Sequence, residues 1–256
     1  MRLMIEFVVK IKIGIIILLF LNMQQITKNI YQIKLGMVNA FLIEDNGFTL
    51  IDTGYKNSSD KIFDAISKAG KNPNDIKQVI LTHAHPDHSG SAAELKKRLN
   101  IPVLAHEEDA KIIEQGIGGR MPFVLSPGIV NWMVFNLLIK NSDPSIEKLP
   151  IDQKLRHNDV LPIAGGVQVI HTPGHSAGHI VLLVKNEGVL ISGDLCANVM
   201  GLDLSTVYED RQLGVQSILN VAALDFDTAV FGHGNALKKE ANKKLKAKFS
   251  TMNLKI

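Results

Sequence analysis

The chain of 256 residues is poor in cysteine and in aromatic residues, with one cysteine, one tryptophan and three tyrosines. The single cysteine, Cys196, excludes an intramolecular disulfide framework and any metal site made of cysteines alone. Hydrophobic residues make up 46% of the chain and charged residues 21%, a composition that excludes a disordered chain and a polytopic membrane protein. The length allows one large domain or two small ones, with a sizeable buried core.

The formal net charge of +3 comes from the two ends of the chain. Residues 238–249 carry six lysines and one glutamate, and residues 1–25 carry three basic side chains and one acidic side chain. The rest of the chain carries 19 basic and 23 acidic side chains, a net charge of about −4. A nucleic-acid-binding domain is expected to have a basic face of its own. We therefore interpret the lysine-rich end as the solvated face of a C-terminal helix and do not expect nucleic acid as a partner.

The N-terminal residues 1–24 are interpreted apart from the fold. Residues 13–21 form an apolar run of nine residues behind two lysines, which suits the core of a signal peptide and is too short to span a bilayer as a straight helix. We expect a cytoplasmic protein in which this segment is an extension upstream of a start at Met23. The alternatives are an exported protein and a membrane anchor, which would give membrane contact through residues 1–24. Residues 25–256 are expected to form the folded domain.

An internal repeat organises the folded part of the chain. Residues 38–54 (VNAFLIEDNGFTLIDTG) and 178–194 (GHIVLLVKNEGVLISGD) each consist of two apolar runs joined by a short turn containing Asn and Gly. Each segment also carries an aspartate after its second run, Asp52 in the first and Asp194 in the second. This pattern predicts two β-hairpins, one in each half.

An amphipathic helix and a further strand are expected after each hairpin. The helices are predicted over residues 59–69 and 210–223. The side chains predicted to be buried are Ile62, Phe63, Ile66 and Ala69 in the first helix and Leu213, Ile218, Val221 and Ala222 in the second. Each half then returns to an apolar strand, within 76–85 and 228–234, that ends in histidine. A strand–strand–helix–strand order that occurs twice predicts an α/β fold with two sheets face to face, helices outside and two similar halves.

The first group of candidate metal ligands lies in the motif HAHPDH, residues 83–88. In an extended segment alternate side chains face the same way, so His83 and His85 are expected to converge. Asp87 and His88 lie in the following turn and are expected to serve a neighbouring position. Four nitrogen and oxygen ligands within six residues are too many for one open catalytic zinc, and they favour two adjacent metal ions.

The second half supplies further candidates. His175 lies in a Pro-Gly turn after an apolar strand, Asp194 ends the second hairpin, and His233 lies between two glycines directly after a strand. The flanking glycines allow close backbone approach at His233. We expect all these groups to lie at strand ends on one edge of the fold, where loops carry chemistry on a rigid scaffold.

The order HAHPDH, TPGHS, SGD and GHG resembles the metallo-β-lactamase fold superfamily, and within it the small glyoxalase-II-like metallo-hydrolases of unassigned substrate. The resemblance implies a four-layer αββα sandwich. It also implies two metal ions, each held by three side chains: His83, His85 and His175 for one, and Asp87, His88 and His233 for the other. Asp194 would bridge the two ions, and Asp52 would support the ligand loops without binding a metal.

This ligand set predicts a dinuclear metal-dependent hydrolase. Two divalent cations about 3.5–4 Å apart would share a hydroxide that attacks an acyl or phosphoryl centre. Asp87 and Asp194 are the expected catalytic carboxylates. The donor set favours two zinc ions, with iron or manganese as alternatives. We expect a small ester, thioester or lactone as substrate; the alternative is a nucleic-acid phosphodiesterase or RNA-binding protein on the same core.

Residues 121–140 form an apolar segment between the halves and contain the only tryptophan. Three interpretations are open: a core or edge helix, a contact surface for a membrane or a partner, and a lid or acyl-binding wall that includes Phe123, Trp132 and Phe135. The remaining histidines are expected to have structural roles: His106, His157, His171 and His179. Cys196 is expected to be a small buried hydrophobe.

Overall fold

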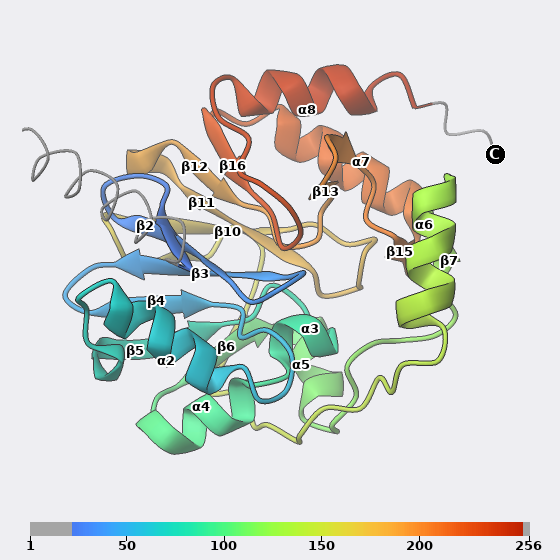
Figure 1. The fold of residues 1–256 in the computed structure, drawn as a ribbon. Helices are drawn as coiled ribbons and strands as arrows, with labels where there is room; N and C mark the ends of the chain where they lie inside the picture. Colours follow the sequence, from blue (N-terminus) through green and yellow to red (C-terminus); the bar gives the residue numbers. More distant parts are fainter. Residues whose placement is uncertain (1–21, 253–256) are drawn as a thin grey trace, which may run out of the picture.

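The computed structural model describes residues 22–252, which form four layers with two β-sheets face to face between outer helices (Figure 1). The first sheet has seven strands: β1 (Met23–Gln25), β2 (Ile30–Lys34), β3 (Asn39–Glu44), β4 (Phe48–Ile51), β5 (Ile76–Ile80), β6 (Val103–His106) and β8 (Gln153–Leu155). The second has five, in the order β16 (Thr228–Val230), β12 (Val189–Ile191), β11 (Ile180–Val184), β10 (Val167–His171) and β9 (Val160–Leu161). This arrangement confirms the predicted α/β sandwich.

Three hydrophobic cores hold the four layers together. The central core lies between the two sheets, and side chains of β3 show how it forms. Phe41 and Ile43 point into the central core, while Ala40 and Leu42 point into the outer core on the other face, because successive side chains of a strand alternate. Both faces of this strand are therefore buried.

The outer cores are closed by amphipathic helices. The first sheet is covered by α2 (Ser59–Lys68), α4 (Ala92–Leu99) and α5 (Glu107–Ile113). The second sheet is covered by α7 (Arg211–Ala222) and α8 (Ala241–Phe249). Helix α8 buries Ala241, Leu245 and Phe249, so the lysines between them lie on the outer face of an amphipathic helix.

Both predicted hairpins are present. Strands β3 and β4 pair antiparallel, as do β11 and β12. Residues 45–47 join the first pair, with φ values of +50° at Asn46 and +122° at Gly47, a backbone region that Asn and Gly tolerate better than other residues. The first sheet also includes Met23 and Gln24, in β1, which the sequence interpretation placed in the N-terminal segment.

The two predicted helices are present, but two of their predicted core positions are wrong. Ala69 is exposed because it is the C-cap of α2, where the chain leaves the helix. Leu213 is 42% exposed. The buried face of α7 is centred on Gly214, Ile218 and Val221, and at 100° per residue Leu213 falls at the edge of that face.

Shorter elements complete the fold. They are η1 (Pro73–Asp75), α3 (Pro86–Ser89), β7 (Val124–Leu125), α6 (Ile129–Val134), η2 (Phe135–Ile139), η3 (Lys185–Glu187), β13 (Ala197–Asn198), β14 (Leu202–Asp203) and β15 (Val207–Tyr208). The apolar segment 121–140 forms α6 and the π-helical η2, with Trp132 54% and Leu137 74% exposed. This segment therefore lies at the edge of the fold and not in its core.

Among residues 22–252, no helix is both long and apolar enough to cross a membrane. The apolar run at residues 13–21, on which the expectations about export, anchoring and an upstream extension depend, lies outside the described residues.

Candidate metal centre

The predicted ligands follow strands that end at one edge of the sandwich. Strands β4, β5 and β6 are parallel, so their carboxyl ends meet, and Asp52 and residues 83–88 lie just beyond them. In the second sheet β12 and β16 are parallel, and Asp194 and His233 follow their carboxyl ends. His175 follows β10, which runs in the same direction as β12 because both are antiparallel to β11.

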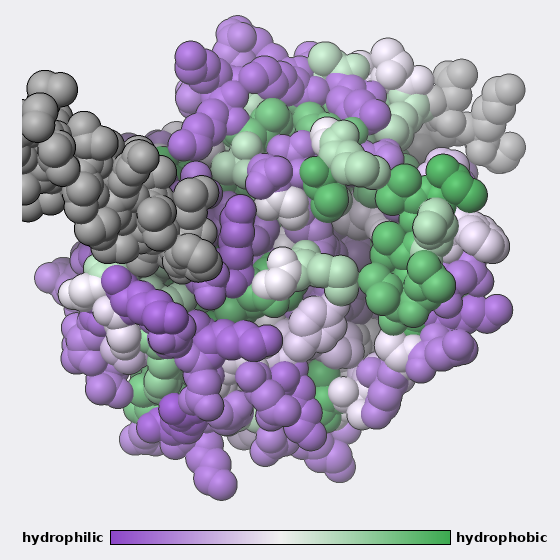
Figure 2. Space-filling model, viewed as in Figure 1, coloured by the Kyte–Doolittle hydropathy of each residue, from purple (hydrophilic) through white to green (hydrophobic). Residues whose placement is uncertain are grey.

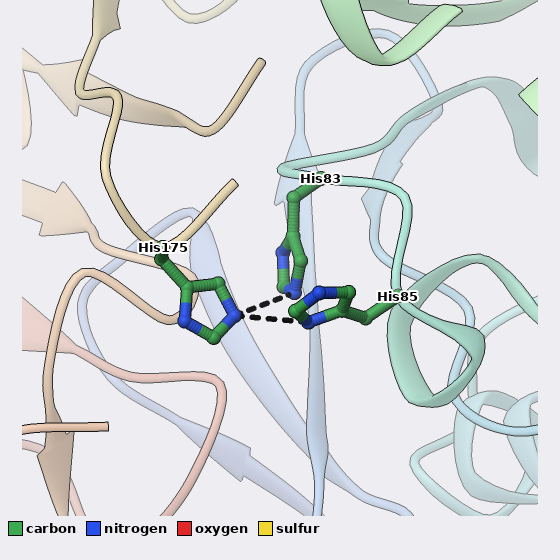
Figure 3. Close-up of side chains that lie close together, drawn as sticks. All are labelled: His83, His85 and His175. Atoms are coloured by element: carbon green, nitrogen blue, oxygen red, sulfur yellow. Dashed lines mark hydrogen bonds between the residues drawn. The ribbon is translucent and has the colours of Figure 1, made fainter. Parts of the chain in front are cut away.

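Three buried histidines from the two halves of the chain converge at this edge (Figure 3). The Nε2 atom of His175 lies 3.2 Å from Nε2 of His83 and 3.0 Å from Nδ1 of His85. One ring nitrogen from each of the three falls within 4.8 Å of the others. This spacing suits a single cation with three nitrogen ligands.

The hydrogen bonds behind these rings determine which nitrogens carry lone pairs. Thr82 donates its hydroxyl proton to Asp52, so its Oγ1 accepts from Nδ1–H of His83, 3.0 Å away. His175 likewise donates Nδ1–H to the carbonyl oxygen of Val207, at 2.9 Å. In the neutral rings, the Nε2 atoms that face each other therefore both carry lone pairs.

Asp87, His88 and His233 form a second group beside the first. The Nε2 atom of His233 lies 3.3 Å from Oδ2 of Asp87, and Nε2 of His88 lies 3.8 Å from the same oxygen. His88 donates Nδ1–H to Asp52 at 2.9 Å, and His233 donates Nδ1–H to the carbonyl oxygen of Met37 at 2.7 Å. Both rings therefore turn Nε2 toward the carboxylate.

Asp194 lies between the two groups. Its Oδ2 is 3.6 Å from Nε2 of His175 and 3.2 Å from Nε2 of His233, and its Oδ1 is 3.3 Å from Nε2 of His88. The backbone N–H of Asp194 donates to Nε2 of His179 at 3.0 Å. One carboxylate thus faces ligands of both groups.

These residues fit divalent metal ions. His88 Nε2 and Asp194 Oδ1 are buried and have no hydrogen-bond partner within the described part of the chain, and such orphaned atoms are uncommon in folded proteins. Facing lone pairs at 3.2 Å, as on His83 and His175, repel each other unless a cation lies between them. The donor set can therefore bind divalent metal.

Burial and the nearby carboxylates shift the pKa values of the histidines in opposite directions in the two groups. Burial lowers the pKa of His83, His85 and His175, which keeps these rings neutral and able to donate lone pairs. Burial would also lower the pKa of His88, but the carboxylates of Asp194, Asp87 and Asp52 outweigh it and raise this pKa to about 10. The second group thus attracts positive charge.

Asp52, which was predicted to support the ligand loops, accepts three hydrogen bonds. It is fully buried and accepts from the backbone N–H and the hydroxyl of Thr82, both at 2.8 Å, as well as from His88. Its φ of +60° is a strained value for a residue with a side chain. The close fit around Asp52 retains this strained conformation.

The other predicted residues lie at different distances from the centre. The ring of Phe123 lies 5.7 Å from the ring of His85, edge to face. Trp132 and Phe135 lie on α6 and η2, further along the same segment. Of the remaining histidines, His179 is buried next to Asp194, while His106 and His171 stack on each other with ring centroids 4.0 Å apart.

Sequence reasoning missed one buried acid at this edge. Asp109, in the first turn of α5, is fully buried and accepts hydrogen bonds from Ala84 and Ser176, neighbours of three ligands. The available signal was an acidic triplet, residues 107–109, directly after an apolar strand that ends in histidine. Such a triplet is typical of the solvated first turn of a helix, so it does not by itself indicate a buried acid.

Comparison with known proteins gives a family. Residues 33–233 match the model of the metallo-beta-lactamase superfamily. The Bacillus subtilis protein YflN, named a probable metallo-hydrolase, is 25% identical over 226 residues, which cover 81% of this chain and 84% of that protein. The hydroxyacylglutathione hydrolase of Rhizobium meliloti is 26% identical over 175 residues, covering 67% of this chain and 52% of the enzyme.

Solved structures agree in fold. A metallo-beta-lactamase family protein of Thermus thermophilus superposes with a TM-score of 0.65 at 21% identity, covering 88% of this chain and 80% of its own. The subclass B3 metallo-beta-lactamase BJP-1 of Bradyrhizobium japonicum gives 0.65 at 22% identity, covering 90% and 89%. The family match, the fold and the histidine and aspartate cluster lead to one conclusion: this chain belongs to the metallo-beta-lactamase superfamily and is a metal-dependent hydrolase.

Proposed function

We propose that this chain is a dinuclear zinc hydrolase that cleaves a small ester, thioester or lactone. The observation that carries the proposal is the position of Asp194, whose two oxygens lie 3.2 to 3.6 Å from ring nitrogens of both ligand groups. A carboxylate with one such contact would serve a single cation, whereas this one can serve two. Mixed imidazole and carboxylate donors favour zinc.

In this proposal six side chains hold the two metal ions, and one of them also transfers a proton. When bound, the two cations supply a water of lowered pKa and a Lewis acid for the substrate oxygen. His83, His85 and His175 hold one cation, and Asp87, His88 and His233 hold the other. Asp87 is one of the more open of these side chains at 20% exposed, and we assign it to accept the proton that the attacking water loses and to pass that proton to the leaving group.

The surroundings of the centre support an acyl substrate with an apolar part. Apolar side chains gather over α6 and the neighbouring loops (Figure 2), and Met121, Ile129 and Trp132 are each more than half exposed. We propose that Phe123 borders the substrate and that Trp132 and Phe135 extend this wall. A relative that hydrolyses hydroxyacylglutathione, a thioester, supports the same class of reaction.

The test is hydrolysis by the zinc-loaded protein across thioesters, lactones, carboxyl esters, β-lactams and phosphodiesters. Asp194→Asn should abolish turnover and reduce the bound zinc from two ions to one. Asp203→Asn, which changes an exposed carboxylate on β14, is the matched control and should behave as wild type. Turnover of phosphodiesters alone would contradict the acyl proposal, and one zinc per chain in the wild type would contradict the dinuclear one.

The apolar wall has its own test. Trp132→Ala should raise KM for apolar acyl substrates with little change in kcat, because the ring contributes binding area but no reacting group. Leu213→Ala, at an apolar side chain 42% exposed on α7, is the control and should leave KM unchanged. An unaltered KM for Trp132→Ala, accompanied by lost stability, would assign the ring a packing role.

A further inference from the structure

A second buried carboxylate lies behind the three-histidine group. Asp109 is fully buried in the first turn of α5, and its two oxygens accept four hydrogen bonds. Oδ2 accepts from the backbone N–H of Ala84 at 3.0 Å and from the hydroxyl of Ser176 at 2.7 Å. Oδ1 accepts from the backbone N–H of Gly178 at 2.9 Å and from the guanidinium of Arg120 at 2.8 Å.

These contacts join the two halves of the metal centre. Ala84 lies between His83 and His85 in the first half of the chain, and Ser176 directly follows His175 in the second half. A single carboxylate thus fixes the separation between the loop that carries two ligands and the loop that carries the third.

The loop that carries His175 is held on acidic side chains over three successive residues. Ser176 and Gly178 donate to Asp109, and the backbone N–H of Ala177 donates to Glu209 at 2.8 Å. The approach is close, because a Cβ atom at Gly178 would lie 2.4 Å from the backbone nitrogen of Asp109. The packing leaves this loop little room to move relative to α5.

Arg120 places a positive charge beside the buried carboxylate of Asp109. Its guanidinium pairs with Asp109 and donates to the backbone carbonyl of Glu108 at 2.6 Å. All four hydrogen bonds to Asp109, including the one from this guanidinium, come from donors. The carboxylate thus presents acceptor oxygens to the two loops.

We propose that Asp109 is a positioning residue for the cation held by His83, His85 and His175. Outer groups that orient metal ligands commonly change metal affinity by about 10- to 100-fold when replaced. In Asp109→Asn, one pair of donors would face an amide NH₂ in place of an oxygen, so at least one of the two loops must shift. The inference rests on the two-metal arrangement proposed above.

The experiment is a titration of the metal-free full-length protein with Co²⁺, followed by its visible absorption and by competition with a chelator. Wild type should bind two Co²⁺ ions in two steps. His233→Ala disables the second group, so the step that remains in this variant belongs to His83, His85 and His175. Asp109→Asn should weaken that step about 10- to 100-fold and alter its absorption bands, with the other step changed less than about threefold. Asp152→Asn is the matched control, because Asp152 also accepts a backbone N–H, from Val103, and pairs with a basic side chain, Lys96, away from the ligands.

A gentler variant covers the case in which Asp109→Asn does not fold. Ser176→Ala removes one of the four hydrogen bonds and should weaken the same step by about 2- to 10-fold, the equivalent of one hydrogen bond. Equal weakening of both steps, or no change in either variant, would overturn the positioning role. Uptake of fewer than two Co²⁺ ions by wild type would instead contradict the proposed function.

Discussion

Gly232 provides a way to disturb the metal centre without removing any ligand. It lies next to His233, and a Cβ atom added to it would lie 2.2 Å from Oδ1 of Asp194 and 2.6 Å from Cε1 of His88. Real Cβ atoms essentially never come within 3.0 Å of another atom. In Gly232→Ala, Asp194 or His88 must therefore move.

The size of the effect follows from the overlap. Restoring an ordinary contact of about 3.4 Å displaces the Asp194 carboxylate by roughly 1 Å, about five times the tolerance of about 0.2 Å on metal–ligand distances. We expect at least one cation to bind about 100-fold more weakly, and kcat/KM to fall by about 100-fold or more. Metal content after dialysis and thioester hydrolysis measure the two effects.

Gly70→Ala separates this effect from a general loss of stability. Gly70 has a φ of +74° with nothing within 4 Å of the added Cβ, so alanine should cost about 1 kcal/mol of unfolding free energy and leave metal content unchanged. If Gly232→Ala retains two tightly bound metals and full activity, the reasoning from the overlap is refuted.

Three further predictions concern stability. Burial and the neighbouring His171 lower the pKa of His106 to about 4. Between about pH 6.5 and pH 4, this histidine is therefore protonated in the unfolded chain but neutral in the folded protein. About 3 kcal/mol of unfolding free energy should be lost as the pH falls through this range. His106→Asn keeps an acceptor for the N–H of Glu108 and should remove that part of the loss in urea unfolding; an equally steep pH dependence would contradict this account. Phe249→Ala, at a fully buried ring on α8, should cost about 3–5 kcal/mol of unfolding free energy with metal content unchanged, and loss of metal would show that α8 supports the site. Chelation of the metals should lower the midpoint of thermal unfolding, and zinc should restore it. At a zinc concentration a thousandfold above Kd, the free energy of unfolding should rise by about 4 kcal/mol. An unchanged midpoint would mean that metal binding and folding are independent.

The parts of the fold that depend on local chemistry could be predicted from the sequence. The turn at Asn46 and Gly47 is one, because these two residues tolerate positive φ. The apolar runs on either side of that turn then determine a hairpin with both faces buried. The positions of the predicted ligands could be inferred in the same way, since a group placed just after a parallel strand must lie at the carboxyl edge of its sheet.

What escaped prediction depends on contacts between distant segments. The partners of Asp109 come from residues 84, 120, 176 and 178, and no pattern around residue 109 indicates them. Leu213 is a smaller case of the same kind, because helical spacing gives the direction of a side chain but not how far the neighbouring sheet extends over it. Sequence periodicity thus predicts faces, and tertiary packing decides which positions at the edge of a face are covered.

The loop with four of the proposed ligands is fixed at two nearby points by two buried acids. Asp52 accepts from the backbone N–H of Thr82, and Asp109 accepts from that of Ala84. Asp52, together with Asp194 and Asp87, makes the edge of the sandwich acidic, which is why the pKa of His88 rises despite its burial. A divalent cation would supply positive charge at this acidic edge. It would also bind the facing lone pairs of His83 and His175, which protonation of His88 leaves unpaired. Positioning of the ligands and attraction for the metal therefore have a common source in the carboxylates behind them.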